Sequence, residues 1–328
     1  MNVLCVGLAV CDILLQPIPK DIMHKDSCFI GKPAISTGGD ATNVAITLRK
    51  LGADVALSCY VGNDTNGDFI YDRVNGFGID VSGILRHPVM GTAVTYILIE
   101  DNGERHFISH GEMLDVLTAR DVPDKLLEEA DLVFFGSAMV MKGMDEGGAA
   151  ALFKKARRLG KITAADVTGN NGEKDRGYWH KCLAPILRET DLFAPSYDEA
   201  VLITGERELR KIRDAFSHYG LKYLAVKLGK EGCYVTDFSS ESTIPTFDSF
   251  TPVDTTGAGD SFVGGLMFGL LTGWPLETAA VFANAVASFS ITKLGATTGA
   301  PDFDDVYKFV TQNCGGEACF PLKNTGSE

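Results

Sequence analysis

The chain has no arrangement of cysteine and histidine that suits a structural metal or a disulfide framework. Its eight cysteines are scattered, none forms a Cys-x-x-Cys pair, and no Cys/His cluster has zinc spacing. Several cysteines lie in apolar runs, among them Cys5, Cys59 and Cys233. This distribution indicates buried thiols in a reducing compartment, and we expect a cytoplasmic protein.

Long apolar runs and an excess of positive charge are also absent. No stretch approaches the roughly 20 apolar residues that a membrane-spanning helix needs. Residues 1–15 are apolar without a basic leader, and Asp12 interrupts them, so they predict a buried strand rather than a signal peptide. The net charge of −13 argues against nucleic acid or an anionic membrane as a partner, because binding would release no counterions.

The 328 residues contain instead a repeated alternation of short apolar runs with helical patterns. Such alternation is typical of an α/β protein with a mostly parallel sheet covered by helices on both faces, a three-layer α/β/α fold. The predicted strands are 3–7, 55–60, 132–135, 162–165, 192–194 and 223–228, and the predicted helices are 43–51, 147–159, 198–204 and 262–271. We expect one core built from residues 1–12, 37–91 and 111–312.

Two segments break this rhythm. Residues 92–110 alternate in period two around the turn 101–103, which predicts a β-hairpin. Residues 13–36 contain three prolines and also read as extended. We expect the two segments to pair into a small β-sheet that acts as a lid over a ligand, although two ordinary surface hairpins would give the same pattern. Residues 313–328 are glycine-rich and polar and predict a flexible tail.

The most informative segment runs from Asp254 to Asp260, just before the predicted helix 262–271. Gly257, Ala258 and Gly259 have little or no side chain, so their backbone N–H groups can approach an anion at a helix N-terminus. An anion site with an adjacent carboxylate, here Asp260, suits phosphoryl transfer, in which the carboxylate takes the proton of the attacking hydroxyl. The structural alternative is a tight turn with Asp260 as a helix cap.

A second segment places paired glycines and polar residues before another helix. Gly38 and Gly39 would let a ligand lie against the backbone. Asp40 and Asn43 are three residues apart and share the face of the first helical turn. Asp12, just past the first strand, is expected at the carboxyl edge of the sheet, where α/β proteins bind ligands. Carboxylates and an amide suit a polyhydroxylated ligand, although each residue alone could serve as a cap or a turn.

Taken together and in this order, the two segments resemble the signatures of the ribokinase-like carbohydrate kinases, the pfkB family. The first signature is Gly38-Gly39…Asn43-Val44-Ala45, and the second is complete from Asp254 to Asp260. The resemblance extends over residues 3–312. It implies an enzyme that transfers the γ-phosphate of MgATP to a hydroxyl of a monosaccharide or a sugar acid.

The resemblance also implies roles for individual residues. Asp260 would be the general base. The anion hole would be Gly257, Ala258 and Gly259. The sugar would be held by Asp12, Gly38, Gly39, Asp40 and Asn43. The nucleotide would contact Ser196, Lys227, Gly229, Gly232 and Asn284. Glu199 would hold Mg²⁺ through water, and a loop for a monovalent cation such as K⁺ would consist of Asp254, Thr256, Ser290, Lys293 and Gly295.

Some positions depart from the family pattern or add to it. Val10 stands where ribokinase-like enzymes carry a sugar-binding asparagine, which argues against ribose as the substrate. Ser196 replaces the asparagine of the family's Asn-x-x-Glu motif. Arg105 and His110 on the lid, and Asp166 after a strand, are further candidates for substrate recognition. Arg105 would favour an acidic or phosphorylated sugar, unless it is simply exposed on the hairpin.

Other functions stay open at this point. A nucleoside kinase would use the same site, with a slot for the base beside Asp12. A non-catalytic sugar sensor is disfavoured because Asp260, the anion hole and Glu199 are all present. A Rossmann dehydrogenase is disfavoured because residues 7–12 lack the three-glycine fingerprint. An exposed edge of the lid would allow a homodimer to form through this sheet.

Overall fold

The computed structural model describes residues 1–31, 33–168, 176–314 and 320, and a nine-stranded sheet forms its centre. The strands are β1 (Asn2–Val6), β4 (Asp54–Gly62), β5 (Asp80–His87), β8 (Leu132–Ala138), β9 (Ile162–Val167), β10 (Leu192–Phe193), β11 (Tyr223–Lys227), β12 (Cys233–Thr236) and β13 (Glu241–Ile244). Their order is β13-β12-β11-β10-β9-β8-β1-β4-β5. Neighbours from β11 to β5 are parallel, whereas β12 and β13 pair antiparallel at one edge, which confirms the predicted mostly parallel sheet.

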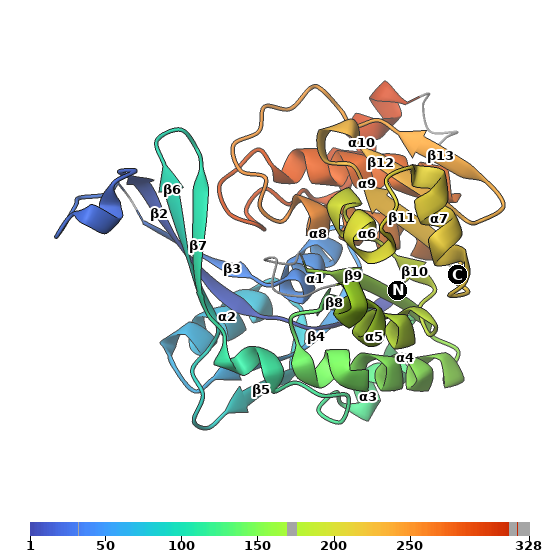
Figure 1. Ribbon diagram of the computed structural model, residues 1–328, viewed down its shortest axis with the longest axis horizontal. Coiled ribbons are helices and arrows are strands. Elements are labelled where there is room, and N and C mark those ends of the chain that lie inside the picture. The colour runs from blue at the N-terminus through green and yellow to red at the C-terminus, as the bar shows by residue number, and fades with distance from the viewer. Residues whose placement is uncertain (32, 169–175, 315–319, 321–328) are drawn as a thin grey trace, which may run out of the picture.

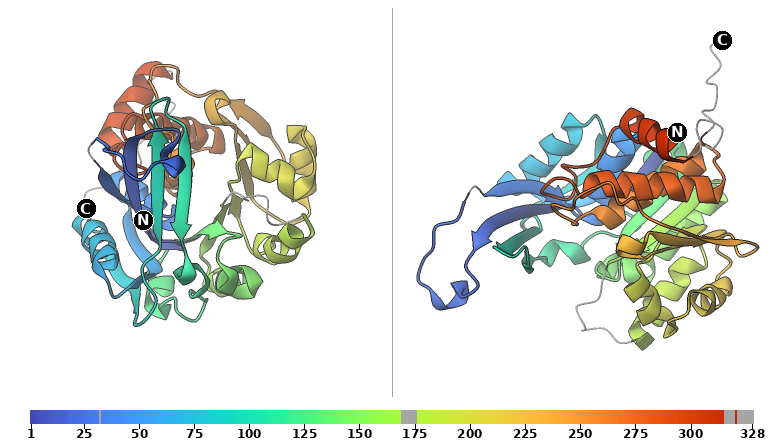
Figure 2. Two further views of the ribbon diagram at one scale, coloured as in Figure 1. Left: turned by 60° about the vertical axis from the view of Figure 1, so that its left-hand side comes forward. Right: turned by 90° about the horizontal axis from the view of Figure 1, so that it is seen from above.

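Helices cover both faces of this sheet, because successive side chains of each buried strand point to opposite sides. Val3 and Cys5 of β1 belong to one apolar core, and Leu4 and Val6 to the other. The first core is covered by α1 (Asp40–Lys50), α2 (Thr65–Gly76), α8 (Ala258–Leu271), α9 (Leu276–Ser290) and α10 (Phe303–Asn313). The second is covered by α3 (Asp124–Glu129), α4 (Ala149–Arg158), α5 (Arg176–Leu187), α6 (Tyr197–Thr204) and α7 (Leu209–Ser217). Figure 2 shows the two helical layers on either side of the sheet.

Short helical turns complete the described chain. They are η1 (Ile22–His24), η2 (Glu112–Asp115), η3 (Met144–Gly148) and η4 (Gly229–Glu231). No helix of the described residues is long and apolar enough to span a bilayer. The cysteines at positions 5, 59 and 233 are buried and free, as predicted. The predicted tail 313–328 lies almost entirely outside the described residues.

A second, four-stranded sheet projects from the core (Figures 1 and 2). It consists of β3 (Ala34–Gly38), β2 (Val10–Ile18), β6 (Val94–Glu100) and β7 (Arg105–His110), in that order. The predicted hairpin is present as β6 and β7, and β2 of the proline-containing segment pairs with it. The small sheet reaches further toward the core than residues 13–36, since β2 begins at Val10 and β3 ends at Gly38.

The strand order changes direction at β1, which has β4 on one side and β8 on the other. Ligands of open α/β sheets bind in the crevice at such a point, beyond the carboxyl ends of the strands. Gly7 follows β1 here with a φ of +149°, and a Cβ at this position would lie 2.6 Å from the carbonyl oxygen of Gly136. The close approach brings the ends of β1 and β8 together beside the start of α1.

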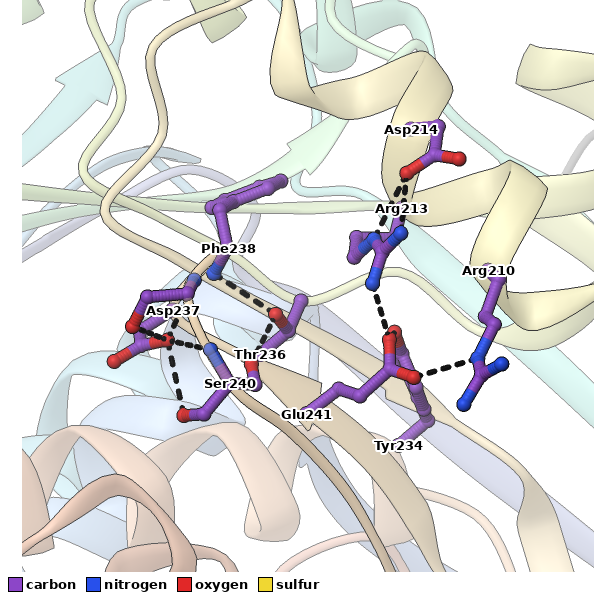
Figure 3. A network of polar contacts seen from close by, with 10 residues as sticks. Arg210, Arg213, Asp214, Tyr234, Thr236, Asp237, Phe238, Ser240 and Glu241 are labelled. Carbon is purple, nitrogen blue, oxygen red and sulfur yellow. Dashed lines mark hydrogen bonds and ion pairs between the residues drawn. The ribbon is translucent and has the colours of Figure 1, made fainter.

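The antiparallel edge of the large sheet is held by polar contacts (Figure 3). The carboxylate of Glu241 on β13 accepts hydrogen bonds from Arg210 at 2.7 Å and Arg213 at 2.5 Å, both on α7. The hydroxyl of Tyr234 on β12 donates to the same carboxylate at 2.7 Å, and these contacts lower the pKa of Glu241. The network ties α7 to the edge strands and covers a sheet edge with charge, which protects it from pairing with another chain.

Candidate active site

The N-terminus of α8 is shaped by a glycine in a left-handed conformation. Gly257 has φ +74° and ψ +3° and precedes the first helical residue, Ala258. A Cβ at Gly257 would lie 2.5 Å from the carbonyl oxygen of Ala296, so both the conformation and the space require glycine. The first N–H groups of a helix have no partner within it. Among residues 257–259, the N–H of Ala258 donates a long hydrogen bond of 3.3 Å to the carbonyl of Thr255, which an anion at this N-terminus would replace. Asp260 lies in the first turn beside these residues, as predicted.

Asp260 is half-buried, and the charges of the carboxyl groups of Asp40 and Asp166 act on it. Its Oδ2 accepts a hydrogen bond of 2.8 Å from Nδ2 of Asn43, which begins the other signature helix, α1. Burial and the charge of Asp40 raise the pKa of Asp260 well above its usual range, whereas Asn43 and Lys227 act in the opposite direction. The Oδ1 of Asn43 is buried and has no hydrogen-bond partner among the described residues. Such an acceptor fits a hydroxyl group that would lie between α1 and Asp260.

Asp12 belongs to β2 of the small sheet, opposite Ser36 and Thr95, so the strand that carries it begins before the predicted lid segment 13–36. Its carboxyl group lies close enough to Asp40 and Asp254 for their charges to act on it. A Cβ at position 38 would lie 2.2 Å from the carboxylate of Asp12, so a residue larger than glycine would clash with it. Burial, with the charges of Asp254 and Asp40, raises the pKa of Asp12 to about 7.

Gly39 and Asp40 begin α1 at the same crevice. Gly39 has φ +91° and lies against the backbone carbonyl of Leu8, where a Cβ would be 2.5 Å from the oxygen. The carboxylate of Asp40 accepts a hydrogen bond from the hydroxyl of Thr168. Thr168 follows β9 and belongs to no motif, so sequence reasoning did not identify it.

Asp166 and Lys227 form a buried ion pair at the carboxyl ends of β9 and β11. The Nζ of Lys227 donates to Oδ2 of Asp166, and their side chains are 15% and 5% exposed. Burial raises the pKa of Asp166 to about 7, against the effect of Lys227. Burial alone would lower the pKa of Lys227, but Asp166 and Glu199 raise it, so the ammonium stays charged. A Cβ at Gly259 would lie 3.5 Å from Nζ, which places this cation beside the anion hole.

A cavity of about 470 Å³ opens on the other side of the α8 N-terminus. It is lined by the predicted nucleotide residues Lys227, Gly229, Gly232 and Asn284, and by Ala258 and Gly259 of the anion hole. The amide of Asn284 donates to the carbonyls of Ile244 and Pro245, both at 3.1 Å, and so holds one wall of the cavity. Lining residues that the sequence did not reveal are Lys230, Thr246, Phe247, Asp248, Phe250, Pro252, Thr255, Phe262, Ala287, Ser288 and Ile291.

Ser196 and Glu199 form a capping box at the start of α6. The backbone N–H of Ser196 donates to Glu199 Oε2 at 2.7 Å, and the Ser196 hydroxyl accepts from the N–H of Glu199 at 3.3 Å. The described residues contain no cluster of three or more His, Cys, Asp or Glu that could hold a metal ion. The role of Glu199 toward Mg²⁺ through water stays a prediction, and it fits the habit of this ion to keep several waters and to bind phosphates.

The comparison with known proteins agrees with this geometry. Residues 2–302 match the model of the pfkB family of carbohydrate kinases. The chain belongs to this family. It is similar to an ATP-dependent ribose-1-phosphate kinase of Halopiger xanaduensis, with 29% identity over 283 residues that cover 84% of this chain and 87% of the relative.

Further similarities fit the same assignment. The 2-dehydro-3-deoxygluconokinase of Bacillus subtilis is 26% identical, with 88% of this chain and 90% of the relative covered. The structure of a fructokinase with bound ATP from Xylella fastidiosa has the same fold, with a TM-score of 0.82, 22% identity and coverage of 95% and 98%. This pfkB-family protein is accordingly a phosphotransferase with an alcohol group as acceptor.

The lid arginine of this kinase is not exposed on the hairpin. The side chain of Arg105 is 21% exposed, and its Nη1 lies 2.8 Å from Asp254 Oδ1 and 2.5 Å from Thr256 Oγ1. His110, on the same strand, is exposed. Arg105 thus contacts the predicted cation loop, and it also lines a cavity of about 480 Å³ between the small sheet and that loop.

The remaining residues of that loop lie together in this pfkB-family fold. The N–H groups of Thr256 and Gly295 donate to the two oxygens of Asp254, at 2.8 and 2.7 Å, and the backbone of Asp254 bonds to Ile291. Ser290 is buried and Lys293 is exposed nearby. Because Arg105 already balances the charge of Asp254, the carboxylate suits a monovalent cation poorly.

Proposed function

We propose that this enzyme transfers the γ-phosphate of MgATP to a hydroxyl of an uncharged monosaccharide. The observation that carries the proposal is the position of Asp260. On one side it contacts Asn43 of α1, near Asp12 and Asp40; on the other it adjoins the N-terminus of α8, which borders the cavity of about 470 Å³. One carboxylate therefore lies between an acceptor site and a nucleotide site.

The chain supplies each part of an in-line transfer. Asp260 accepts the proton of the attacking sugar hydroxyl. The hydroxyl oxygen forms a bond to the γ-phosphorus while the bond from that phosphorus to ADP breaks. The N–H groups of residues 257–259 and the ammonium of Lys227 stabilise the charge on the transferred group. Asp12, Asp40 and the free Oδ1 of Asn43 accept hydrogen bonds from the other hydroxyls of the sugar. Mg²⁺, held through water by Glu199, would neutralise the phosphates.

The charges around the acceptor site favour an uncharged sugar. Five carboxylates gather there, at positions 12, 40, 166, 254 and 260. The described basic side chains that reach them, Arg105 and Lys227, are already paired with Asp254 and Asp166. An acidic or phosphorylated sugar would have to break one of these pairs or lie against like charge, which is costly in a buried site. This revises the preference for acidic sugars that Arg105 suggested in the sequence.

We expect kcat/KM for the best uncharged sugar to exceed that for any sugar acid or sugar phosphate by at least about 10-fold. Release of ADP from MgATP across pentoses, hexoses, sugar acids, sugar phosphates and nucleosides would measure it, with Asp260→Asn as the inactive control. A sugar phosphate as the best acceptor would overturn the charge argument and leave the kinase intact. A nucleoside as the best acceptor would establish the nucleoside kinase instead. If no compound stimulates ADP release and the protein still binds ATP, the non-catalytic sugar sensor would be favoured.

We also propose that two copies associate through their small sheets. One face carries a continuous apolar row across all four strands, in the pairing Ile35–Ile13–Tyr96–Ile108. Ile35, Tyr96 and Ile108 are 58%, 42% and 53% exposed, an unusual exposure for a row of large apolar side chains. A second copy is the natural occupant, because a self-complementary two-fold contact would bury the row twice.

We expect a dimer in sedimentation at micromolar protein and a monomer for Tyr96→Glu, since a charge at the centre of an apolar contact is expensive to bury. Val89→Glu is the matched control, because Val89 is 88% exposed outside the small sheet. A monomeric wild-type protein, or a dimer that survives Tyr96→Glu, would contradict this assignment.

A further inference from the structure

Arg105 is the described residue that joins the small sheet to the core by an ion pair. It extends from β7 to a loop far along the chain, where its Nη1 forms an ion pair with Asp254 and donates a hydrogen bond to the hydroxyl oxygen of Thr256. The side chain of Asp254 is 1% exposed, so this pair is shielded from solvent. Shielded pairs keep far more of their interaction than surface pairs do.

The rest of the contact between lid and loop is small. Leu14, Ile97 and Ile99 of the small sheet pack with Leu294, one residue before Gly295. Beside this contact a cavity of about 480 Å³ separates the tip of the small sheet from Val253 and Leu294. The guanidinium of Arg105 therefore makes most of the polar contact between the small sheet and the loop that contains Asp254 and Thr256.

Asp254 connects Arg105 to the backbone next to the predicted anion hole. One carboxylate oxygen forms the ion pair with Arg105 and accepts a hydrogen bond from the N–H of Thr256, and the other accepts one from the N–H of Gly295. Gly257 follows Thr256 directly and sets the start of α8 by its left-handed conformation. Whatever fixes Asp254 and Thr256 therefore fixes the direction in which the N–H groups of residues 257–259 point.

We propose that Arg105 is a positioning residue that couples docking of the small sheet to the geometry of the anion hole. The proposal rests on the proposed function only in taking residues 257–259 as the phosphate site. With the lid docked, the Arg105–Asp254 pair holds the loop for phosphoryl transfer. With the lid displaced, Asp254 keeps a buried charge without its partner and the loop relaxes.

The test compares Arg105→Met, Asp254→Asn and the double variant in steady-state kinetics. We expect each single substitution to lower kcat by about 10²-fold, the loss that a misplacement of roughly 1 Å can cause, with a smaller change in the acceptor KM. The double variant should lose no more than the worse single one, because both break the same contact. Arg105→Lys should be intermediate. His106→Gln is the control, since His106 pairs with Glu100 inside the small sheet.

Hydrogen exchange gives a readout that needs no acceptor. Peptides covering residues 252–262 should exchange faster in Arg105→Met than in wild type or His106→Gln, while peptides of β8 and β9 stay unchanged and thermal melts remain cooperative. This result would stand even if no acceptor were found, so it is separable from the proposed function. An acceptor KM that rises with kcat intact would make Arg105 a substrate ligand instead. The proposal would also be overturned if the losses of kcat multiplied in the double variant, or if hydrogen exchange of residues 252–262 were unchanged in Arg105→Met.

Discussion

Asp260→Asn is expected to lower kcat by about 10³-fold, within the range that a general base contributes. The amide keeps the size of the side chain and can still accept the hydrogen bond from Asn43, but it cannot take a proton. Because the pKa of Asp260 is raised, wild-type kcat should also fall as the pH drops and the carboxylate becomes protonated. The KM for ATP should change little, since Asp260 does not line the nucleotide cavity. Loss of less than about 10-fold would exclude Asp260 as the base.

The same substitution should stabilise the fold, and the sign follows from the pKa. The folded-state pKa of Asp260 lies above its unfolded value, so the folded protein binds more protons between the two values, and stability falls as the pH rises through this range. Removing the charge should therefore raise Tm by several degrees at pH 8 and have little effect at pH 4. Asp72→Asn is the control, because Asp72 is exposed on α2. An equal change in Tm at both pH values would contradict the linkage. The ionised carboxylate that catalysis needs would thus lower the stability of the folded protein.

The fold could be predicted from the sequence because its signals are local. The apolar run at β8 and the helical period of α4 each lie within one segment, and alternation of the two kinds implies a parallel sheet. The loop Asp254–Asp260 was equally readable, since the small residues before a helix define an anion site on their own.

The parts that could not be predicted depend on contacts between distant segments. The position of Asp12 on the small sheet was not predicted, because nothing local shows that the chain enters β2 so soon after β1. Arg105 was a candidate for substrate recognition because its type suits anions, and its ion pair with Asp254 was not predicted because that partner lies far along the chain. Likewise the wall of the nucleotide cavity around Phe247 and Phe250 has no regular pattern, and only its packing against α9 and α10 gives it a form.

Lys227 interacts with groups from several segments that are far apart in the sequence. Its ammonium pairs with Asp166, faces the backbone of Gly259, and lowers the pKa of Asp260. The cation therefore has two consequences for transfer: it offsets charge on the phosphoryl group, and it helps to keep the base ionised at neutral pH. Glu199 adds to the negative surroundings that hold Lys227 charged.

We expect Lys227→Met to lower kcat by about 10²-fold and to raise the KM for ATP, because a preorganised charge at the transferred group is lost. The acid limb of the pH profile should move to higher pH, since the substitution removes a group that lowers the pKa of Asp260. A change confined to the KM for ATP, with the acid limb in place, would reduce Lys227 to a lining residue of the cavity.

Stability separates the structural effect from the catalytic one. Lys227→Met leaves the buried carboxylate of Asp166 with the N–H of Val167 but without a cation, which costs about 3–5 kcal/mol. The cost should be smaller at pH 5, where Asp166 is protonated because its pKa is raised. Adding Asp166→Asn to Lys227→Met removes the unpaired charge and should restore the free energy of unfolding at pH 8. If the double variant is stable yet remains about 10²-fold slow, the loss of rate belongs to the missing cation. If it recovers activity as well, Lys227 serves only to neutralise Asp166.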